Sequence, residues 1–332
     1  MKKTIFALCS LFCVCALQAQ NTPYITHVWE YMPAPGQFVH ELPTYTAGDD
    51  AESMRQKAEE QIANNAQGMI SLGGWGGYVV FSFDHPVVNV PGENDLIVEG
   101  NAFYTDATQG AAGGGSCEPG IVMVSVDANA NGFPDDEWFE LAGSEYTNPL
   151  TKHGYSVTYY RTETHENVPW QDNEQQTGVI AVNNFHKQNY YPIWAGDSLC
   201  FTGARLPDNY AKQGNQYVLY PYEYGYADNH PDTARFAQLN IEWAVRTDGS
   251  PIHLSTVDFI KVYTALHQQV GSLGETSTEI KGARDLHPDA APTGIIDTNS
   301  ETQATKTMRN GQLLIQRDNK TYNSLGIQIN NN

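Results

Sequence analysis

The chain has 332 residues, with 18 Lys and Arg against 38 Asp and Glu, which gives a formal net charge of -20. A chain this acidic repels phosphate backbones and anionic lipids, so nucleic acid is excluded as a partner and binding to an anionic membrane surface is disfavoured. The same acidity suits a protein that collects cations. Hydrophobic residues make up 40% of the chain, and 29 Gly with 19 Tyr favour sheets and turns over a helical bundle.

The first nineteen residues have the pattern of a secretory signal peptide. Lys2 and Lys3 form a basic start, residues 5–17 form a short apolar run, and Ala19 offers a small side chain before a cut at Gln20. The run is too short to span a bilayer comfortably. We therefore expect an exported protein, on the cell surface or extracellular.

Export would leave two cysteines, Cys117 and Cys200, in an oxidising compartment. A disulfide between them and two separate thiols both fit the sequence. Their spacing does not match a metal site.

One helix is expected early in the chain, after an irregular, Pro-rich segment at 21–48. Asp49 can cap it, and apolar residues recur every four positions behind this cap, so the helix should run to about 64–65. The residues of its apolar face are Met54, Ala58 and Ile62.

Short runs of β-branched and aromatic residues, bounded by Gly, Pro, Asn or Asp, dominate the rest of the chain. They predict an all-β fold, an antiparallel β-sandwich or jelly roll with one short N-terminal helix. The expected strands are 78–83, 95–99, 121–126, 137–141, 155–160, 179–182, 198–201, 216–220, 239–245 and 257–263. The expected organisation is a signal peptide at 1–19, a β-sandwich binding domain at 20–287, a linker at 288–307 and a hairpin at 308–332.

A loop at 127–137 places oxygen-bearing side chains at relative positions 1, 3, 5 and 9, with Gly132 at position 6 where a sharp turn is needed. Calcium takes six to eight oxygen ligands, which this alternation can supply. Position 12 is Trp138 rather than the Glu of an EF-hand, so Glu137 or Asp136 must serve instead. The expected calcium ligands are Asp127, Asn129, Asn131, the carbonyl of Phe133, Asp135 and Glu137. A turn without an ion is the alternative, because these residue types favour turns anyway.

Aromatic residues gather in two further segments and in a glycine-rich stretch at 71–77. Rings stack on sugar faces or flat macrocycles, so these residues could line a ligand groove; packing at a sheet edge is the alternative. The candidate ligand-binding residues are Trp75, Phe185, Tyr190, Tyr191, Trp194, Tyr222 and Tyr224.

Catalytic signatures are weak. The sequence has neither the His-Glu-x-x-His pattern of zinc proteases nor the Gly-x-Ser-x-Gly turn of many hydrolases. A pair of carboxylates such as Glu99 and Glu118 could serve a glycosidase, but nothing in the sequence selects one pair. We therefore expect no enzymatic activity.

Many short phrases, in order between about residues 27 and 287, resemble those of a family of Bacteroidetes cell-surface proteins. The phrases are 69–80, 83–86, 99–103, 118–125, 140–146, 225–231, 240–245 and 273–279. The resemblance implies an exported protein with a jelly-roll-like domain; larger members of the family carry PKD-like domains in addition. Genes of this type resemble those found beside outer-membrane nutrient uptake systems, cobalamin capture included, which makes a corrinoid one ligand hypothesis.

The C-terminal stretches 309–317 and 321–326 resemble a short sorting domain of the type IX secretion kind. The resemblance implies that the protein crosses the outer membrane and that this tail is removed or exchanged for an anchor.

Together these features predict a calcium-stabilised, non-enzymatic surface protein that captures a small-molecule, glycan or corrinoid ligand, with an outer-membrane uptake complex as a partner. Two alternatives remain open: an adhesin or assembly component that binds another protein, and a glycan-active hydrolase.

Overall fold

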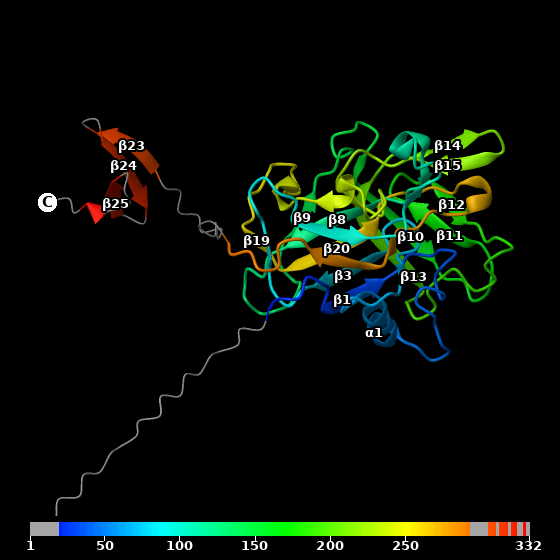
Figure 1. The fold of residues 1–332 in the computed structure, drawn as a ribbon. Helices are drawn as coiled ribbons and strands as arrows, with labels where there is room; N and C mark the ends of the chain where they lie inside the picture. The colour runs from blue at the N-terminus through cyan, green and yellow to red at the C-terminus, as the bar shows by residue number, and fades with distance from the viewer. Residues whose placement is uncertain (1–19, 293–304, 310–311, 318–319, 324–327, 330–332) are drawn as a thin grey trace, which may run out of the picture.

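The computed structural model describes residues 20–292 and four later strands. These strands are β23 (Thr305–Arg309), β24 (Gln312–Arg317), β25 (Lys320–Asn323) and β26 (Gln328–Ile329). The signal peptide expected at 1–19 lies outside the described residues, as does most of the expected linker. Within the described residues, antiparallel sheets and one α-helix confirm the predicted all-β sandwich, and no sheet closes into a barrel (Figure 1).

The largest sheet forms the centre of the fold and is antiparallel throughout. Val, Ile and Phe form nearly continuous runs along its inner strands, which is the pattern of a sheet that packs on both faces. In sheet order its strands are β1 (His27–Met32), β3 (Tyr78–Ser82), β20 (Phe259–Thr264), β8 (Gly120–Ser125), β9 (Trp138–Leu141) and β18 (Ala244–Val245), and β16 (Tyr226–Ala227) pairs with β8.

A four-stranded sheet packs beside the central sheet and supplies the second layer. Its strands, in order, are β12 (Thr177–Ile180), β11 (Val168–Asp172), β10 (Lys152–Tyr160) and β13 (Ser198–Arg205). Tyr78 of the central sheet meets Phe201 of this layer edge to face, with ring centroids 6.3 Å apart. Trp75, Tyr155 and Tyr159 are fully buried in the core that this layer shares with the loops around it.

Shorter sheets and 3₁₀ turns complete the fold. One sheet contains β14 (Tyr210–Gln213), β15 (Gln216–Leu219), β7 (Gly115–Ser116) and β6 (Phe103–Tyr104), and another contains β17 (Gln238–Leu239), β5 (Leu96–Glu99) and β22 (Gly282–Asp285). The two-stranded pairs are β19 (Thr256–Val257) with β4 (Val87–Val88), and β2 (Ile70–Ser71) with β21 (Glu279–Ile280). The 3₁₀ turns are η1 (Gly110–Gly113), η2 (Arg235–Ala237), η3 (Ile241–Trp243) and η4 (Gly271–Leu273).

Helix α1 (Ala51–Ile62) lies against β1 at the edge of the central sheet (Figure 1). Its buried residues are Met54, Ala58 and Ile62, as the sequence predicts. The cap is Asp50 rather than Asp49. The Asp50 carboxylate accepts the backbone N–H of Ser53 at 2.9 Å, and the Ser53 hydroxyl accepts the backbone N–H of Asp50 at 2.8 Å. Asp49 instead pairs with Lys57, and the helix ends at Ile62, two residues before the expected stop.

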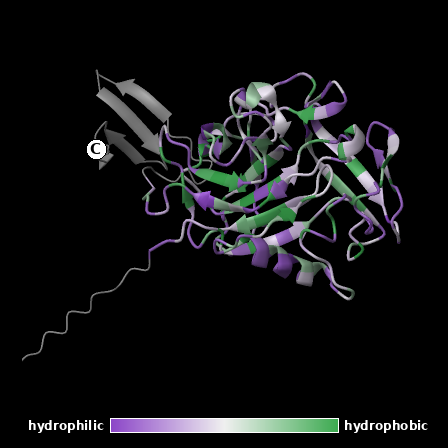
Figure 2. Ribbon diagram, turned by 45° about the vertical axis from the view of Figure 1, so that its right-hand side comes forward, coloured by the Kyte–Doolittle hydropathy of each residue, from purple (hydrophilic) through white to green (hydrophobic). Residues whose placement is uncertain are grey.

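The main core fills the space between one face of the central sheet, α1 and β5. Figure 2 shows hydrophobic residues gathered in the central strands, with hydrophilic residues on α1. This main core consists of aliphatic and aromatic side chains that are far apart in sequence, among them Ile25, Met54, Phe81, Leu96, Val124, Leu239, Ile260 and Ile280.

Two sequence expectations about elements are wrong. The segment 21–48 is not irregular throughout, because His27–Met32 forms edge strand β1 by pairing with β3. The expected strand at 239–245 is instead divided into β17, the η3 turn and β18, since Asn240 caps η3 by accepting the N–H of Glu242 at 2.7 Å. The apolar residues of this segment thus continue through the η3 turn, and the Asn240 side chain fixes the direction of that turn.

Near the C-terminus, β23 to β26 form a four-stranded antiparallel sheet of their own. The expected hairpin corresponds to β24 and β25. β23 begins at Thr305, within the segment expected as a linker.

Neither Cys117 nor Cys200 forms a disulfide within the described residues; Cys117 is buried and Cys200 is exposed. No helix in this part of the chain is both long and apolar enough to cross a membrane.

Candidate functional site

The predicted cation loop joins β8 to β9, which pair as an antiparallel hairpin. Its backbone turns back on itself with positive φ at Ala130 (56°) and Gly132 (78°). The Asp127 carboxylate stands at the centre of the turn, where it accepts the N–H of Asn131 at 3.0 Å and of Gly132 at 2.9 Å. The spacing that predicted a cation loop therefore does bring oxygen atoms to the inside of one tight turn.

The remaining predicted ligands divide into those within the turn and those outside it. Asn129 and Asn131 donate their amide N–H groups to Asp135 at 3.0 and 2.9 Å. The Phe133 carbonyl accepts the N–H of Asp135, and its exposed ring contacts Trp29 with centroids 5.8 Å apart. Glu137 is exposed.

Asp136, the alternative to Glu137, lies closer to the turn. Its carboxylate accepts the N–H of Ala128 at 3.0 Å. A further carboxylate, Asp258, comes from the loop before β20 and accepts the N–H of Asp127 at 2.9 Å. Burial and the nearby Asp127 and Asp136 carboxylates raise the pKa of Asp258. Asp258 was not predicted, because it lies 131 residues further along the chain and belongs to no local motif.

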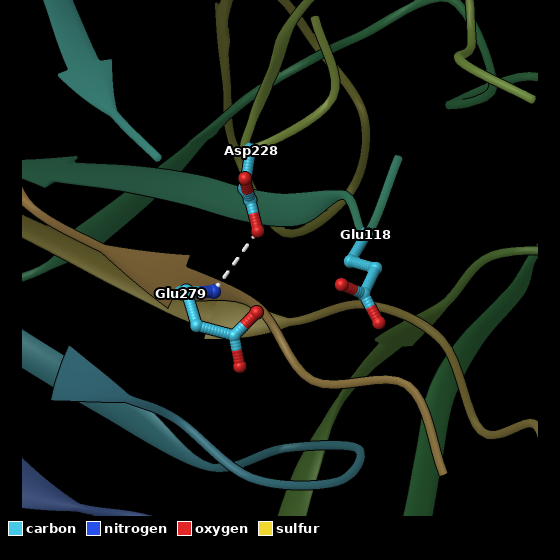
Figure 3. A group of neighbouring side chains, drawn as sticks. All are labelled: Glu118, Asp228 and Glu279. Carbon is cyan, nitrogen blue, oxygen red and sulfur yellow. Dashed lines mark hydrogen bonds between the residues drawn. The ribbon is translucent and has the colours of Figure 1, made fainter. Parts of the chain in front are cut away.

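A second group of carboxylates lies inside the domain: Glu118, Asp228 and Glu279 (Figure 3). Each offers one oxygen atom, and these three atoms lie within 4.8 Å of one another. Asp228 and Glu279 are almost fully buried and Glu118 is half-buried. They come from the ends of three short elements, β16, β21 and the turn after β7, which meet here only in the folded chain.

The backbone holds Asp228 in a fixed position. One carboxylate oxygen accepts the N–H groups of Asn101 and Ala102, both at 2.8 Å, and the other accepts the N–H of Glu279 at 3.0 Å. Gly100 makes room for it, because a Cβ atom there would lie 2.3 Å from the same oxygen. Three N–H donors favour the ionised form of Asp228, but burial and the neighbouring Glu279 carboxylate outweigh them and raise its pKa.

The two glutamates have weaker support. Glu279 accepts a hydrogen bond from the Ser277 hydroxyl at 2.5 Å and one from the Asn101 amide at 3.3 Å, while Glu118 accepts one from the Ser116 hydroxyl at 3.4 Å. Each glutamate therefore keeps acceptor capacity that these hydrogen bonds do not use.

Burial raises the pKa of Glu279 to about 7, and burial together with the other carboxylates raises the pKa of Glu118 and of Asp228. Within residues 20–292 no Lys, Arg or His forms an ion pair with any of the three; Lys281 pairs with Asp232 and Arg284 with Glu99 instead. Buried carboxylates without a basic partner must share protons or hold a cation.

A fourth buried carboxyl group, Glu275, lies close enough to this group to raise the pKa of Glu118. One of its oxygens accepts the N–H of Gln37 at 2.9 Å, and the other is buried without a hydrogen-bond partner among the described residues. Carboxylate oxygens in this number suit a hard cation such as Ca²⁺, Mg²⁺ or Mn²⁺. The three carboxylates of Figure 3 could therefore hold a metal ion.

Three of the aromatic residues predicted to bind ligand are core residues in the structure. Trp75, Tyr190 and Tyr191 have no exposed surface. Their polar atoms bond to the protein: Trp75 donates to the carbonyl of Ala204, and Tyr191 donates to that of Gly196. With neither face nor edge exposed, these rings cannot contact a ligand in this structure.

The other predicted aromatics do not form one groove. Phe185 is 83% exposed on a loop, whereas Trp194 is half-buried and stacks on Tyr45 with centroids 5.7 Å apart. Tyr222 packs against Tyr226 and donates its hydroxyl to the carbonyl of Pro207.

Tyr224 lies in an open cleft of about 400 Å³. Its ring is tilted against that of Trp243 with centroids 5.0 Å apart, and Phe236, 55% exposed, lies on the same cleft. The remaining lining residues are Asn94, Arg235 and Gln238. A second open cleft of about 450 Å³ shares these three residues and extends the space towards Glu93 and His287.

Most of this cleft comes from one stretch, 224–243, that wraps over β5. Asp95 fixes its position: the buried carboxylate accepts the N–H of Val90 and that of Ile241, both at 2.8 Å. β17 pairs with β5 directly behind the cleft. Sequence analysis selected Tyr224 but missed Trp243 and Phe236. Trp243 lies in the segment expected as a strand at 239–245, and Phe236 lies just before it.

No protein-family model matches the chain, and no curated protein matches it.

Proposed function

We propose that this protein is an exported, non-enzymatic ligand-binding protein of the cell surface, built on a β-sandwich that calcium stabilises. The observation that supports ligand binding is the open cleft beside Tyr224, where Trp243 and Phe236 also expose ring surface. Exposed aromatic rings next to amide side chains are typical of sites that bind sugars or flat organic molecules. A glycan or a corrinoid is the expected ligand class.

The remaining parts of the proposal rest on sequence features. The apolar start of the chain and the sorting-like tail support export, and the resemblance to Bacteroidetes surface proteins supports nutrient capture, with an outer-membrane uptake complex as partner. Calcium is assigned to the loop at 127–137, because Asp127, Asp136 and Asp258 direct carboxylates to one turn.

A non-catalytic role is supported by the positions of the two carboxylates that the sequence suggested for a glycosidase. Glu99 pairs with Arg284 at 2.8 Å, and Glu118 belongs to the inner carboxylate group. Neither lies on the aromatic cleft. The carboxylate pair considered for a glycosidase therefore does not flank a ligand bound beside Trp243.

The test is equilibrium binding of glycans and corrinoids to the purified protein, with product analysis of each mixture. We expect binding without turnover, and a loss of at least tenfold in affinity in Trp243→Ala. Phe185→Ala, which removes an exposed ring outside the cleft, is the matched control and should bind as the wild type does. If Trp243→Ala binds as tightly as Phe185→Ala and the wild type, the cleft is not the binding site. A cleaved product would show that the protein is an enzyme.

A further inference from the structure

The cleft beside Tyr224 is lined by one basic side chain, Arg235. Arg235 is exposed on η2 and lines both parts of the cleft. Within residues 20–292 its guanidinium forms no ion pair, although the chain has 38 acidic residues against 18 basic ones. The part of the cleft that holds the aromatic rings has no carboxylate in its lining. An unpaired Arg in such a place is available to an anionic group of a ligand.

The aromatic rings beside Arg235 supply a stacking surface. Trp243 and Tyr224 meet at an interplanar angle of 50°, so they form a bent wall rather than one flat plate. Phe236 follows Arg235 directly in the sequence and is supported from behind by His230, with ring centroids 5.8 Å apart. A bent wall of this kind fits the C–H faces of successive sugar rings better than a wide planar macrocycle.

Two amide side chains line the same cleft, Asn94 from the loop before β5 and Gln238 from β17. Asn94 donates to the Gln238 carbonyl oxygen at 3.2 Å, which leaves the Gln238 amide N–H₂ and the Asn94 carbonyl oxygen for other partners. Paired donors and acceptors of this type match vicinal hydroxyl groups.

The charge balance also indicates the kind of anion. Arg235 is the one Lys or Arg among the residues that line the two described clefts, and Glu93 lies on the second of them. A phosphate carries up to two charges near neutral pH and usually takes more than one cationic or N–H donor group. One guanidinium with a carboxylate nearby suits a singly charged carboxylate, which it can bind through two parallel N–H···O bonds.

We infer that the cleft binds an acidic saccharide, with sugar rings on Trp243 and Tyr224 and the sugar carboxylate on Arg235. This inference rests on the proposed ligand-binding function and narrows its ligand class. The amides of Asn94 and Gln238 contact hydroxyl groups of the same saccharide. Arg235 thereby selects acidic over neutral sugars, and the aromatic wall supplies affinity for both.

The test uses pairs of oligosaccharides that differ in the carboxylate. Titration calorimetry of the purified protein compares an α-1,4-linked galacturonic acid trisaccharide with the galactose trisaccharide of the same linkage, and sialyllactose with lactose. We expect the acidic member of at least one pair to bind at least tenfold more tightly at low salt, and the preference to shrink as salt is added. Arg235→Gln should abolish the preference for the acidic member of each pair.

Lys187→Gln is the matched control, because Lys187 is a basic residue on a loop away from the cleft. It should keep the wild-type preference. Equal affinity for both members of every pair, or a preference that survives in Arg235→Gln, would overturn the inference while leaving neutral-sugar binding in place. A protein that binds a corrinoid and no saccharide would overturn the inference alone. Binding of none of these ligands would count against the proposed function itself.

Discussion

Gly100 shows how closely the inner carboxylate group is built into the backbone. A Cβ atom at this position would meet the Asp228 carboxylate oxygen at 2.3 Å, and that oxygen is held by two N–H groups that cannot easily move. We expect Gly100→Ala to lower the free energy of unfolding by about 1–3 kcal/mol. Urea unfolding measures the loss.

The control for this variant is Gly196→Ala, because a Cβ atom at Gly196 would meet nothing within 4 Å. That variant should stay within about 0.5 kcal/mol of the wild type. A Gly100→Ala protein as stable as its control would mean that Asp228 is not held where the structure places it.

Asp95 should make the stability of the protein depend on pH. Burial raises its pKa to about 6, against the effect of two N–H donors; His287 lowers the pKa and Asp285 raises it. A carboxyl group with a raised folded-state pKa stabilises the fold below its unfolded pKa near 4, and this contribution is lost as pH rises through about 6. The contribution is on the order of 3 kcal/mol.

Asp95→Asn keeps the shape of the side chain and removes its titration. We therefore expect the free energy of unfolding to fall less steeply between pH 4 and 7 in this variant than in the wild type. Chemical denaturation at several pH values measures both slopes. Identical slopes would show that Asp95 is already ionised in the folded state at pH 4.

Single residues also mark the limit of sequence analysis. Asp127 and its neighbours were selected because their spacing is local, and the structure does fold them into one turn. Asp258 and Asp228 were missed because their partners are distant in sequence: 131 residues away for Asp258, and between 51 and 127 residues away for Asp228. Burial was the second obstacle: Trp75 and Tyr190 have the composition of ligand contacts but lie wholly in the core.

At the scale of elements, the β8–β9 hairpin is the structure that calcium should stabilise. Its loop directs several oxygen atoms inward, and an ion that binds the folded state alone stabilises it by mass action. We expect a chelator to lower the melting temperature by about 5 °C or more, and calcium to restore it. Asp127→Ala should melt at a lower temperature and should no longer respond to either.

The inner carboxylate group provides the comparison for this experiment. Asp228→Asn keeps the loop intact, so it should retain the calcium response if the ion binds at 127–137. Glu60→Ala, an exposed change on α1, controls for the loss of a carboxylate in general. If the melting temperature no longer responds to calcium in Asp228→Asn but still does in Asp127→Ala, the cation binds at the carboxylates of Figure 3 and not in the loop.

Elements were predictable where their hydrophobic pattern was simple. The inner strands β3, β8 and β20 carry continuous β-branched and aromatic runs, and α1 has a clear four-residue period. Strand β1 was missed because the Pro-rich segment that follows it dominates the local composition. The prediction of one strand at 239–245 was wrong because the Asn240 cap, rather than the apolar periodicity, sets the direction of the chain there.

For the whole molecule, export is the property that a cell can test directly. If the C-terminal segment directs secretion, a protein that ends at residue 292 should remain inside the outer membrane, while the full chain should be cut by protease added to intact cells. The full chain in a strain without the type IX pathway is the matching control. Surface exposure of the shortened protein would remove the sorting role from the tail.

The central claim is that the cleft beside Tyr224 and Trp243 binds the ligand of a cation-stabilised, non-catalytic protein. It is tested most directly by thermal melts of the wild type and Trp243→Ala against glycans and corrinoids, with calcium present. We predict an upward shift of the wild-type melting temperature by at least one ligand. Trp243→Ala should lose this shift and keep its response to calcium. A ligand shift of equal size in both proteins, or a calcium response with no ligand response in the wild type, would contradict the claim.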